Sequence, residues 1–219
     1  MKAVVFGATG ETGRRIVLEL KRHNIPVRAV VRDITKAKTI LPEDVEILVA
    51  DVSQPSLIKE AIGDCTVLLC ATGATPSLDP TGPYKVDYEG NKNLVDAAKS
   101  MGIEHFVIVS SLCVSRFLHP LNLFWLILYW KKQAEEYIQS SGLTYTIVRP
   151  GGLKNEDSSD PIVMQSADTL FEGSIPRRKV AQVCVEALLY PQSRNKIVEI
   201  VANGNAPVKN TEELFSGVV

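Results

Sequence analysis

The chain has 219 residues, 45% of them hydrophobic and 22% charged, with a formal net charge of -1 at pH 7. This composition excludes disordered and fibrous proteins and is sufficient for one well-packed domain. A net charge near zero gives no support for nucleic acid as a partner. The cysteines lack metal-ligand spacing and most lie in apolar runs. We therefore expect core thiols in a reduced compartment and no metal site, for Cys65, Cys70, Cys113 and Cys184.

Short apolar runs predict β-strands at residues 3–6, 26–32, 45–50, 66–71, 105–109, 144–149 and 196–201. Apolar residues at helical spacing predict helices at residues 14–21, 57–62, 87–101 and 180–189, with another helix that ends before residue 141. This alternation predicts an α/β fold, a single Rossmann-like domain with a doubly wound parallel sheet over residues 1–219. Substrate-covering elements are expected in its C-terminal half.

Two details near the ends of the chain refine this prediction. The first strand is predicted at the very N-terminus, so no signal or transit peptide is expected, and we expect a soluble cytoplasmic protein. Glu199 is the only charge within the last apolar run, which predicts a sheet edge or a partly exposed face.

Glycines connect the first strand to the first helix in the sequence Gly7-Ala8-Thr9-Gly10-Glu11-Thr12-Gly13. Gly7 is expected to form the tight turn, Gly10 to admit a pyrophosphate and Gly13 to let the helix pack on the strand. Backbone N–H groups and the positive end of the helix dipole would bind the phosphates. An ordinary glycine-rich turn is the alternative, because GxxGxxG alone is a weak signal. The predicted cofactor contacts here are Gly7, Thr9, Gly10, Glu11, Thr12 and Gly13.

Arg32 closes the second predicted strand, where a dinucleotide-binding fold meets the adenosine ribose. A carboxylate at this place binds a free 2′-hydroxyl, whereas an arginine binds a 2′-phosphate, so we predict NADP(H) rather than NAD(H). Asp33 follows, but strand alternation points it the other way. The alternative is that Arg32 is a solvated strand end. Asp51 and Val52 are predicted to lie beside the adenine, although Asp51 also suits a helix cap or a turn.

Small residues and serines stand at the carboxyl ends of later strands, which is where parallel sheets bind ligands. Small residues would let a nicotinamide ring lie close to the backbone, and a serine hydroxyl could bond to its carboxamide or to a substrate oxygen. Simple strand termination is the alternative for the serine pair. The further predicted cofactor contacts are Ala71, Thr72, Gly73, Ser110, Pro150, Gly151 and Gly152, and the catalytic candidates are Ser110, Ser111 and Lys132.

These motifs carry a resemblance to a known superfamily. Besides the glycine turn they are Val31-Arg32-Asp33, Val86-Asp87-Tyr88-Glu89-Gly90-Asn91-Lys92-Asn93-Leu94 and Tyr145-Thr146-Ile147-Val148-Arg149-Pro150-Gly151-Gly152-Leu153. The chain resembles atypical short-chain dehydrogenases/reductases, and within them the NmrA-like branch that includes biliverdin reductase B, a flavin reductase. It is also similar to cyanobacterial and plastid relatives, including a dehydrogenase-like protein of the chloroplast import apparatus. The resemblance implies a Rossmann fold and NADP(H), and it adds the plastid stroma as a location for a mature chain.

One departure from this superfamily concerns proton transfer. Its typical members use Tyr-x-x-x-Lys, in which the lysine lowers the tyrosine pKa. Tyr129-Trp130-Lys131-Lys132 has the wrong spacing, because Ile127 and Leu128 stand four residues before the two lysines. Tyr88 and Lys92 have the spacing, but they lie on an earlier helix. The sequence therefore argues against routine alcohol–ketone chemistry, and leaves hydride transfer to a conjugated acceptor, with the proton from solvent or a serine, or no catalysis.

Residues 117–130 form an interrupted apolar segment that is shorter than the ~20 residues needed to span a bilayer. A buried helix is the simplest interpretation. The segment also suits a lid over a flat apolar pocket, or a contact with a membrane surface or a partner protein. His119 is expected to be structural, and Lys131 or Lys132 could meet a substrate carboxylate or a cofactor phosphate. The aromatic residues that would suit a planar ring are Phe124, Trp125, Tyr129 and Trp130.

The sequence leaves three functional hypotheses. The first is an NADPH-dependent reductase of a small planar conjugated acceptor of the biliverdin or flavin type. The second is a non-catalytic NADP(H)-binding redox sensor or scaffold that docks a partner through residues 117–130. The third is a substrate-specific reductase that uses Ser110 or Ser111. A monomer or a dimer is expected in each case.

Overall fold

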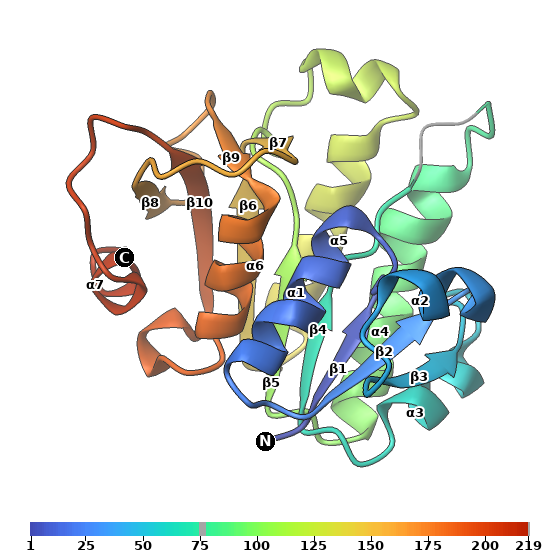
Figure 1. Cartoon of the computed structure of the whole chain (residues 1–219). Coiled ribbons are helices and arrows are strands. Elements are labelled where there is room, and N and C mark those ends of the chain that lie inside the picture. The colour runs from blue at the N-terminus through green and yellow to red at the C-terminus, as the bar shows by residue number, and fades with distance from the viewer. Residues whose placement is uncertain (75–77, 219) are drawn as a thin grey trace.

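The computed structural model describes residues 1–74 and 78–218, and an eight-stranded sheet lies at the centre of this part of the chain (Figure 1). Its strand order is β3-β2-β1-β4-β5-β6-β10-β8; all neighbouring strands are parallel except β8, which is antiparallel to β10. β7 and β9 pair separately. The strands are β1 (Ala3–Phe6), β2 (Val27–Val31), β3 (Glu46–Val49), β4 (Val67–Cys70), β5 (His105–Val109), β6 (Tyr145–Pro150), β7 (Gly152–Lys154), β8 (Ile162–Ser166), β9 (Ser174–Pro176) and β10 (Lys196–Ala202).

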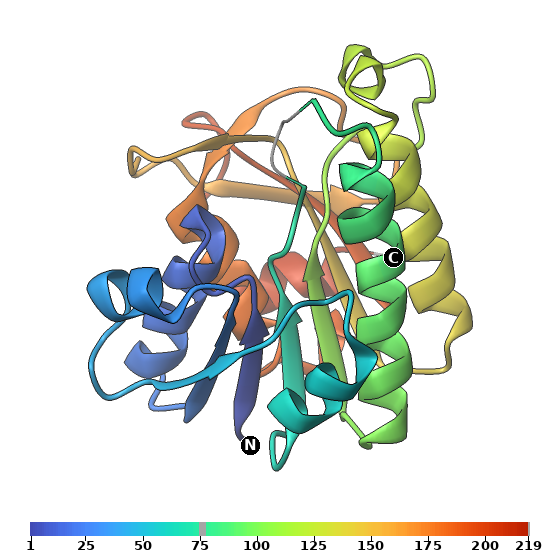
Figure 2. The same ribbon diagram turned by 90° about the vertical axis from the view of Figure 1, so that its right-hand side faces the viewer.

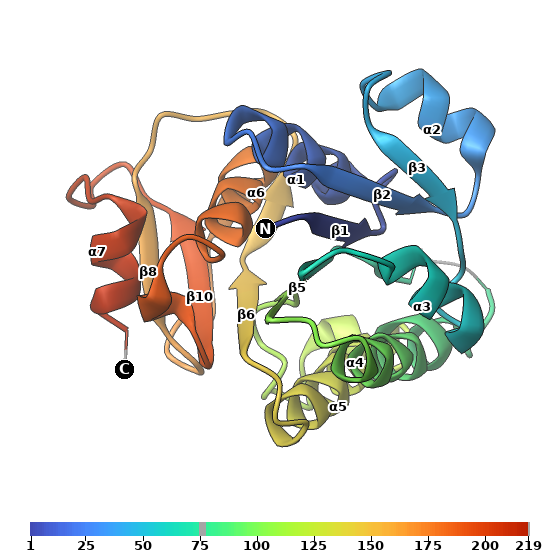
Figure 3. The ribbon, with the colours of Figure 1, turned by 90° about the horizontal axis from the view of Figure 1, so that it is seen from below.

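Helices cover both faces of the sheet, with α1, α2 and α6 on one face and α3, α4 and α5 on the other (Figure 3). Each face has its own apolar core because successive strand side chains point in opposite directions. Val5 belongs to the first core and Phe6 to the second. The helices are α1 (Glu11–Arg22), α2 (Ile34–Ile40), α3 (Pro55–Ile62), α4 (Asn91–Ser100), α5 (Ile127–Ser140), α6 (Arg177–Glu186) and α7 (Thr211–Ser216), with the π-helix η1 (Tyr84–Gly90) and the 3-10 helices η2 (Pro120–Leu123) and η3 (Pro191–Ser193).

The predicted Rossmann-like fold is confirmed, since β3-β2-β1-β4-β5-β6 is the strand order of a doubly wound dinucleotide-binding sheet. Every predicted strand forms part of the sheet. The sequence patterns missed α2, α7, β7, β8 and β9. Of these, β7 and β9 have three residues each and contain Gly152 and Pro176. The helix predicted over residues 87–101 consists of η1 followed by α4.

A buried network of charges joins β6, α5 and β10. Arg149 is fully buried, and its Nη2 lies 2.6 Å from Oε2 of Glu135, which is also buried. Nη1 of Arg149 donates to Oε1 of Glu199 at 3.1 Å and to Oδ1 of Asp168 at 2.8 Å. Burial by itself lowers the pKa of Arg149, but the Glu135 carboxylate outweighs it and the pKa is raised. The guanidinium is therefore charged and compensated on three sides.

Glu199 corrects one prediction made from the sequence. It is fully buried, and β10 lies between β6 and β8, so it is neither at a sheet edge nor on an exposed face. Its carboxylate accepts hydrogen bonds from the backbone N–H groups of Asp168, Thr169 and Leu170 at 2.9, 3.0 and 2.7 Å. Asp168 has a left-handed backbone with φ of 63°. Glu199 thus binds Arg149 and also holds the backbone of the turn after β8.

We predict that Arg149→Met lowers the free energy of unfolding by about 3–5 kcal/mol, because it leaves the two buried carboxylates without the cation that compensates their charge. Urea titration of the wild-type and variant proteins measures this loss. Arg178→Met, which breaks a surface pair with Asp157, should cost no more than about 1 kcal/mol. Equal losses in the two variants would contradict the role of the network.

Candidate functional site

The turn between β1 and α1 requires glycine at two positions. Gly7 has φ of +78°, and a Cβ there would lie 2.7 Å from the carbonyl oxygen of Ala71. A Cβ at Gly13 would lie 2.1 Å from the carbonyl oxygen of Gly7, so α1 packs directly on the end of the strand. Neither place leaves room for a side chain. The turn therefore brings β1, β4 and the start of α1 together, as expected for Gly7 and Gly13.

The N-terminus of α1 fits a pyrophosphate. Gly10 is its N-cap and no side chain of the described residues caps the helix, so the first backbone N–H groups, from Glu11 onward, are left for a ligand. The Glu11 carboxylate turns along the helix to Arg14 and Arg15, at 2.7 and 2.8 Å. The hydrogen bond from Arg15 lowers the pKa of Glu11. The helix dipole at this end is thus available to an anion.

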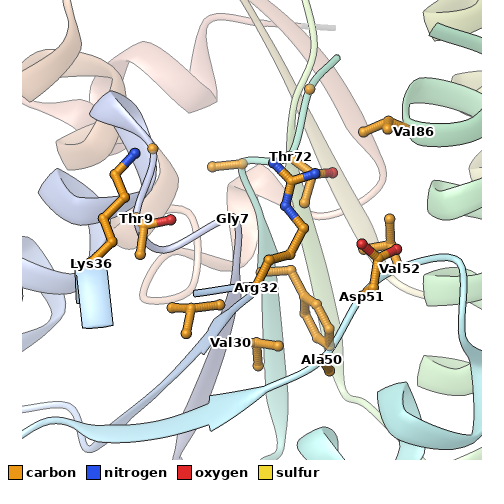
Figure 4. Close-up of a pocket in the computed structure, with 15 residues that line it drawn as sticks. Gly7, Thr9, Val30, Arg32, Lys36, Ala50, Asp51, Val52, Thr72 and Val86 are labelled. Atoms are coloured by element: carbon orange, nitrogen blue, oxygen red, sulfur yellow. The ribbon is translucent and has the colours of Figure 1, made fainter. Parts of the chain in front are cut away.

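A cleft of about 220 Å³ extends from this turn across the ends of β2, β3 and β4. Figure 4 shows Arg32 reaching over the cleft from the end of β2, and Lys36 of α2 extending beside Thr9. Neither cation forms an ion pair within the described residues. Asp33 caps α2 by accepting the Lys36 backbone N–H at 3.0 Å, which holds both cations on the same side. The remaining lining residues are Phe6, Gly7, Gly10, Val30, Val31, Ala50, Asp51, Val52, Ala71, Thr72, Gly73 and Val86.

Asp51 forms a turn at the edge of this cleft. It lines the cleft, and its Oδ1 accepts the Ser53 backbone N–H at 2.8 Å, as in a turn. A side-chain hydrogen bond with Ser53 lowers the pKa of Asp51, and the backbone hydrogen bond and the nearby charge of Arg32 contribute. Lys36 was missed by the sequence analysis. The sequence feature that could have identified Lys36 as a cofactor contact is its place in the first turn of the helix that follows Arg32, where it adds a second cation.

A buried ion pair forms behind the wall of this cleft. Nζ of Lys131 lies 2.7 Å from Oδ1 of Asp87, whose Oδ2 accepts the Ala74 backbone N–H at 3.1 Å. Burial alone lowers the pKa of Lys131, but the Asp87 carboxylate raises it overall. A Cβ at Gly73 would contact Asp87 Oδ1 at 3.7 Å, which places the pair next to the cofactor cleft. The catalytic candidate Lys132 lies 3.9 Å from Glu136 of its own helix and lines neither cleft, whereas its neighbour Lys131 pairs with Asp87 beside the cofactor cleft.

A second cleft, of about 370 Å³, lies at the carboxyl ends of β5 and β6. The Ser110 hydroxyl donates to Oε1 of Glu135 at 2.5 Å, which ties it to the buried charge network. Ser111 makes no such hydrogen bond within the described residues. Of the predicted cofactor contacts, the structure therefore places Ser110, Pro150, Gly151 and Gly152 at this second cleft, while Glu11, Thr12 and Gly13 line neither cleft. The lining residues of this cleft are Ser110, Ser111, Leu112, Cys113, His119, Leu121, Pro150, Gly151, Gly152, Leu153, Phe171, Gly173 and Arg177.

Residues 117–126 form an exposed apolar segment beside this cleft rather than a buried helix. They project beyond the carboxyl ends of the strands, as Figures 1 and 2 show in yellow-green. Leu118 is 93% exposed and Leu123 is 85% exposed. No helix in the described residues is long and apolar enough to span a membrane. The other exposed apolar side chains of the segment are Phe117, Leu121, Phe124, Trp125 and Leu126.

The aromatic residues that follow do not line either cleft. Trp130 packs against Tyr84, Tyr88 and Tyr129, with ring centroids 4.9 to 5.8 Å apart. Tyr129 also meets Phe117 edge-on at 6.1 Å. This cluster attaches the exposed segment to η1.

The fold and the glycine turn define a dinucleotide-binding Rossmann protein. The NAD(P)H-binding family matches residues 7–191, and the chain belongs to this family. The predicted nicotinamide cofactor is thereby confirmed. Arg32 and Lys36 supply the positive charge that a 2′-phosphate requires, which favours NADP(H) over NAD(H).

Relatives of known sequence cover nearly the whole chain. An uncharacterized chloroplastic protein of Arabidopsis thaliana is 49% identical, over 99% of this chain and 82% of its own length. The chloroplastic protein TIC 62 of Pisum sativum is 36% identical over 98% of this chain, which spans only 45% of that protein. Sanguinarine reductase of Eschscholzia californica is 29% identical over all of this chain and 96% of its own.

Solved structures share the fold. A Bacillus halodurans protein named as an NAD-dependent epimerase/dehydratase superposes with a TM-score of 0.88, 25% identity and 99% coverage of both chains. The anaerobilin reductase ChuY of Escherichia coli O157:H7 has a TM-score of 0.78 and 23% identity, over 95% of this chain and all of its own. A short-chain dehydrogenase/reductase of Veillonella parvula in complex with NADP has a TM-score of 0.73 and 17% identity, over 95% and 98%.

We predict that Arg32→Ala and Lys36→Ala each weaken NADPH binding about 10- to 100-fold and leave NADH binding nearly unchanged, because each removes a charged contact to the 2′-phosphate. Calorimetric titration with the two cofactors measures the difference. Lys38→Ala removes a cation of the same helix that does not line the cleft, and should affect neither cofactor. Equal losses of NADPH and NADH binding would refute the assignment.

Proposed function

We propose that the protein is an NADPH-dependent reductase of a planar conjugated acceptor of the bilin or flavin type. The observation that carries this proposal is the composition of the second cleft. Apolar and aromatic groups and backbone line it beside a free serine hydroxyl, and no tyrosine lines either cleft within the described residues. Leu121, Leu153 and Phe171 provide surfaces on which a flat ring can pack.

The same composition favours reduction of a conjugated system over alcohol–ketone chemistry. NADPH, when bound, supplies a hydride. The electron pair displaced by hydride addition moves through the conjugated acceptor to a heteroatom, which then takes a proton. Ser111 is the lining hydroxyl available to donate it or to orient a water that does. Ser110 is committed to Glu135 and acts as a positioning residue, and Lys131 remains a cation at the wall of the cofactor cleft.

The relatives support this chemistry and suggest a location. Sanguinarine reductase and anaerobilin reductase carry names of conjugated ring substrates, and both align along nearly the whole chain. Elements of the C-terminal half, β7, β9 and the turn after β8, would cover the substrate. Chloroplastic relatives favour the plastid stroma over the cytoplasm where the source cell contains plastids.

We predict that NADPH is oxidised in the presence of biliverdin or flavin mononucleotide, which is followed at the nicotinamide absorbance band. Ser111→Ala should lower kcat about tenfold or more, because it removes the proton donor. Ser100→Ala, an exposed serine at the end of α4, serves as the control. Oxidation at background rate with both acceptors would refute the reductase, and an unchanged kcat in Ser111→Ala would assign the proton to solvent.

A second candidate function is an NADP(H)-binding scaffold or redox sensor that docks a partner protein. The exposed apolar side chains of residues 117–126 favour it, because contiguous apolar surface of this kind marks interaction sites. It requires cofactor binding and no turnover.

We predict that the double variant Leu118→Ser with Leu123→Ser loses a partner that copurifies with the wild-type chain from its source cells. Val208→Ser is the control, since Val208 is 87% exposed and lies outside the segment. Quantitative mass spectrometry of the three purifications compares them. The same recovery of every partner by all three proteins would contradict docking through this segment.

A further inference from the structure

Every described residue that lines the second cleft is cationic or neutral. Arg177 and His119 contribute a guanidinium and an imidazole, and no carboxylate lines the cleft within the described residues. The whole chain nevertheless has a net charge of -1. We infer that Arg177 binds a carboxylate carried by the acceptor, so that the substrate is an anionic planar ring. This inference rests on the proposed reductase function and specifies its substrate class.

Arg177 is held in place by neutral partners. It is the first residue of α6 and directly follows β9, which pairs with β7 through Gly152↔Ser174 and Lys154↔Pro176. Its Nη1 donates to the Leu153 carbonyl oxygen at 3.3 Å and to Oδ1 of Asn155 at 2.9 Å. The β7–β9 pair thus anchors one nitrogen of the side chain without neutralising its charge.

The rest of the guanidinium is left for a ligand. Nη2 and Nε of Arg177 donate to no described group, and together they form the fork that a carboxylate accepts. The neighbouring Arg178 differs, since its Nε lies 3.2 Å from Oδ2 of Asp157 and it does not line the cleft. The two adjacent arginines therefore differ. Arg178 is paired with a carboxylate, whereas Arg177 lines the cleft and has no acidic partner among the described residues.

The other walls indicate where the ring would lie. Phe171 is fixed on two sides, because the Arg116 guanidinium stacks on its ring at 3.6 Å and the Cys113 thiol donates to its carbonyl oxygen at 3.3 Å. The Gly152 backbone N–H donates to the Gly173 carbonyl oxygen at 2.9 Å, which joins the two backbone walls. His119 Nδ1 accepts the Leu121 N–H at 3.2 Å, so Nε2 is the ring nitrogen left to donate to a ligand. A ring between Phe171 and the backbone would present its carboxylate to these donors.

The test compares one chromophore with and without its carboxylates. Biliverdin and its dimethyl ester are titrated into the NADP⁺-loaded wild-type protein and three variants, Arg177→Gln, Arg177→Lys and Arg178→Gln, with binding followed by absorbance. The wild-type protein should bind the diacid about tenfold or more tightly than the diester. Arg177→Gln should abolish this preference, Arg177→Lys should retain part of it, and Arg178→Gln should retain it fully.

Equal affinities of the wild-type protein for diacid and diester would overturn the inference, as would a preference that survives in Arg177→Gln or no binding of either compound. NADPH oxidation recorded with the same proteins tests the proposed function separately. Carboxylate-selective binding without NADPH oxidation would refute the reductase function and would still support the Arg177 site. If both compounds were bound with equal affinity and reduced at equal rates, the reductase function would be supported and the Arg177 carboxylate site would be refuted.

Discussion

The buried charge network around Arg149 is the interaction on which the site depends most. It joins β6, α5, β10 and the turn after β8, which meet at the edge of the second cleft. Replacing a buried ion pair with apolar groups is often neutral or stabilising, so such a network is weak evidence for stability as such. Its effect here is positional. Glu135 binds both Arg149 and the Ser110 hydroxyl, and Glu199 fixes the backbone of the turn that leads to Phe171.

The two clefts both lie at the carboxyl ends of the parallel strands, and different charged groups line them. The first offers uncapped helix amides and the cations Arg32 and Lys36, with the carboxylate of Asp51 at its far side. The second contains Arg177 and no carboxylate within the described residues. Both therefore attract anionic ligands, although the chain as a whole is slightly acidic. The positive charge is concentrated where phosphates of the cofactor and the acidic groups of an acceptor would lie.

The features that the sequence predicted correctly are those formed by residues close together in the chain. The β1 strand, the glycine turn and α1 are continuous in the chain, so their geometry follows from spacing alone. The pairing of Lys131 with Asp87 and the position of Arg177 could not be predicted, because each is made by elements far apart in the sequence. Glu199 was interpreted wrongly for the same reason. A lone charge in an apolar run indicates exposure until its partner, Arg149 on the adjacent strand, is known.

The segment after Leu112 connects the two candidate functions physically. Leu121 lines the second cleft, while Leu123, two residues further in the same 3-10 helix, points into solvent. Asn122 between them is buried, and its Oδ1 accepts the backbone N–H groups of Leu128 and Tyr129, so η2 is fastened to the start of α5. A protein that covers the outer side of η2 would therefore also fix one wall of the cleft. Docking and reduction need not be alternatives, because occupancy of one side of this segment constrains the shape of the other.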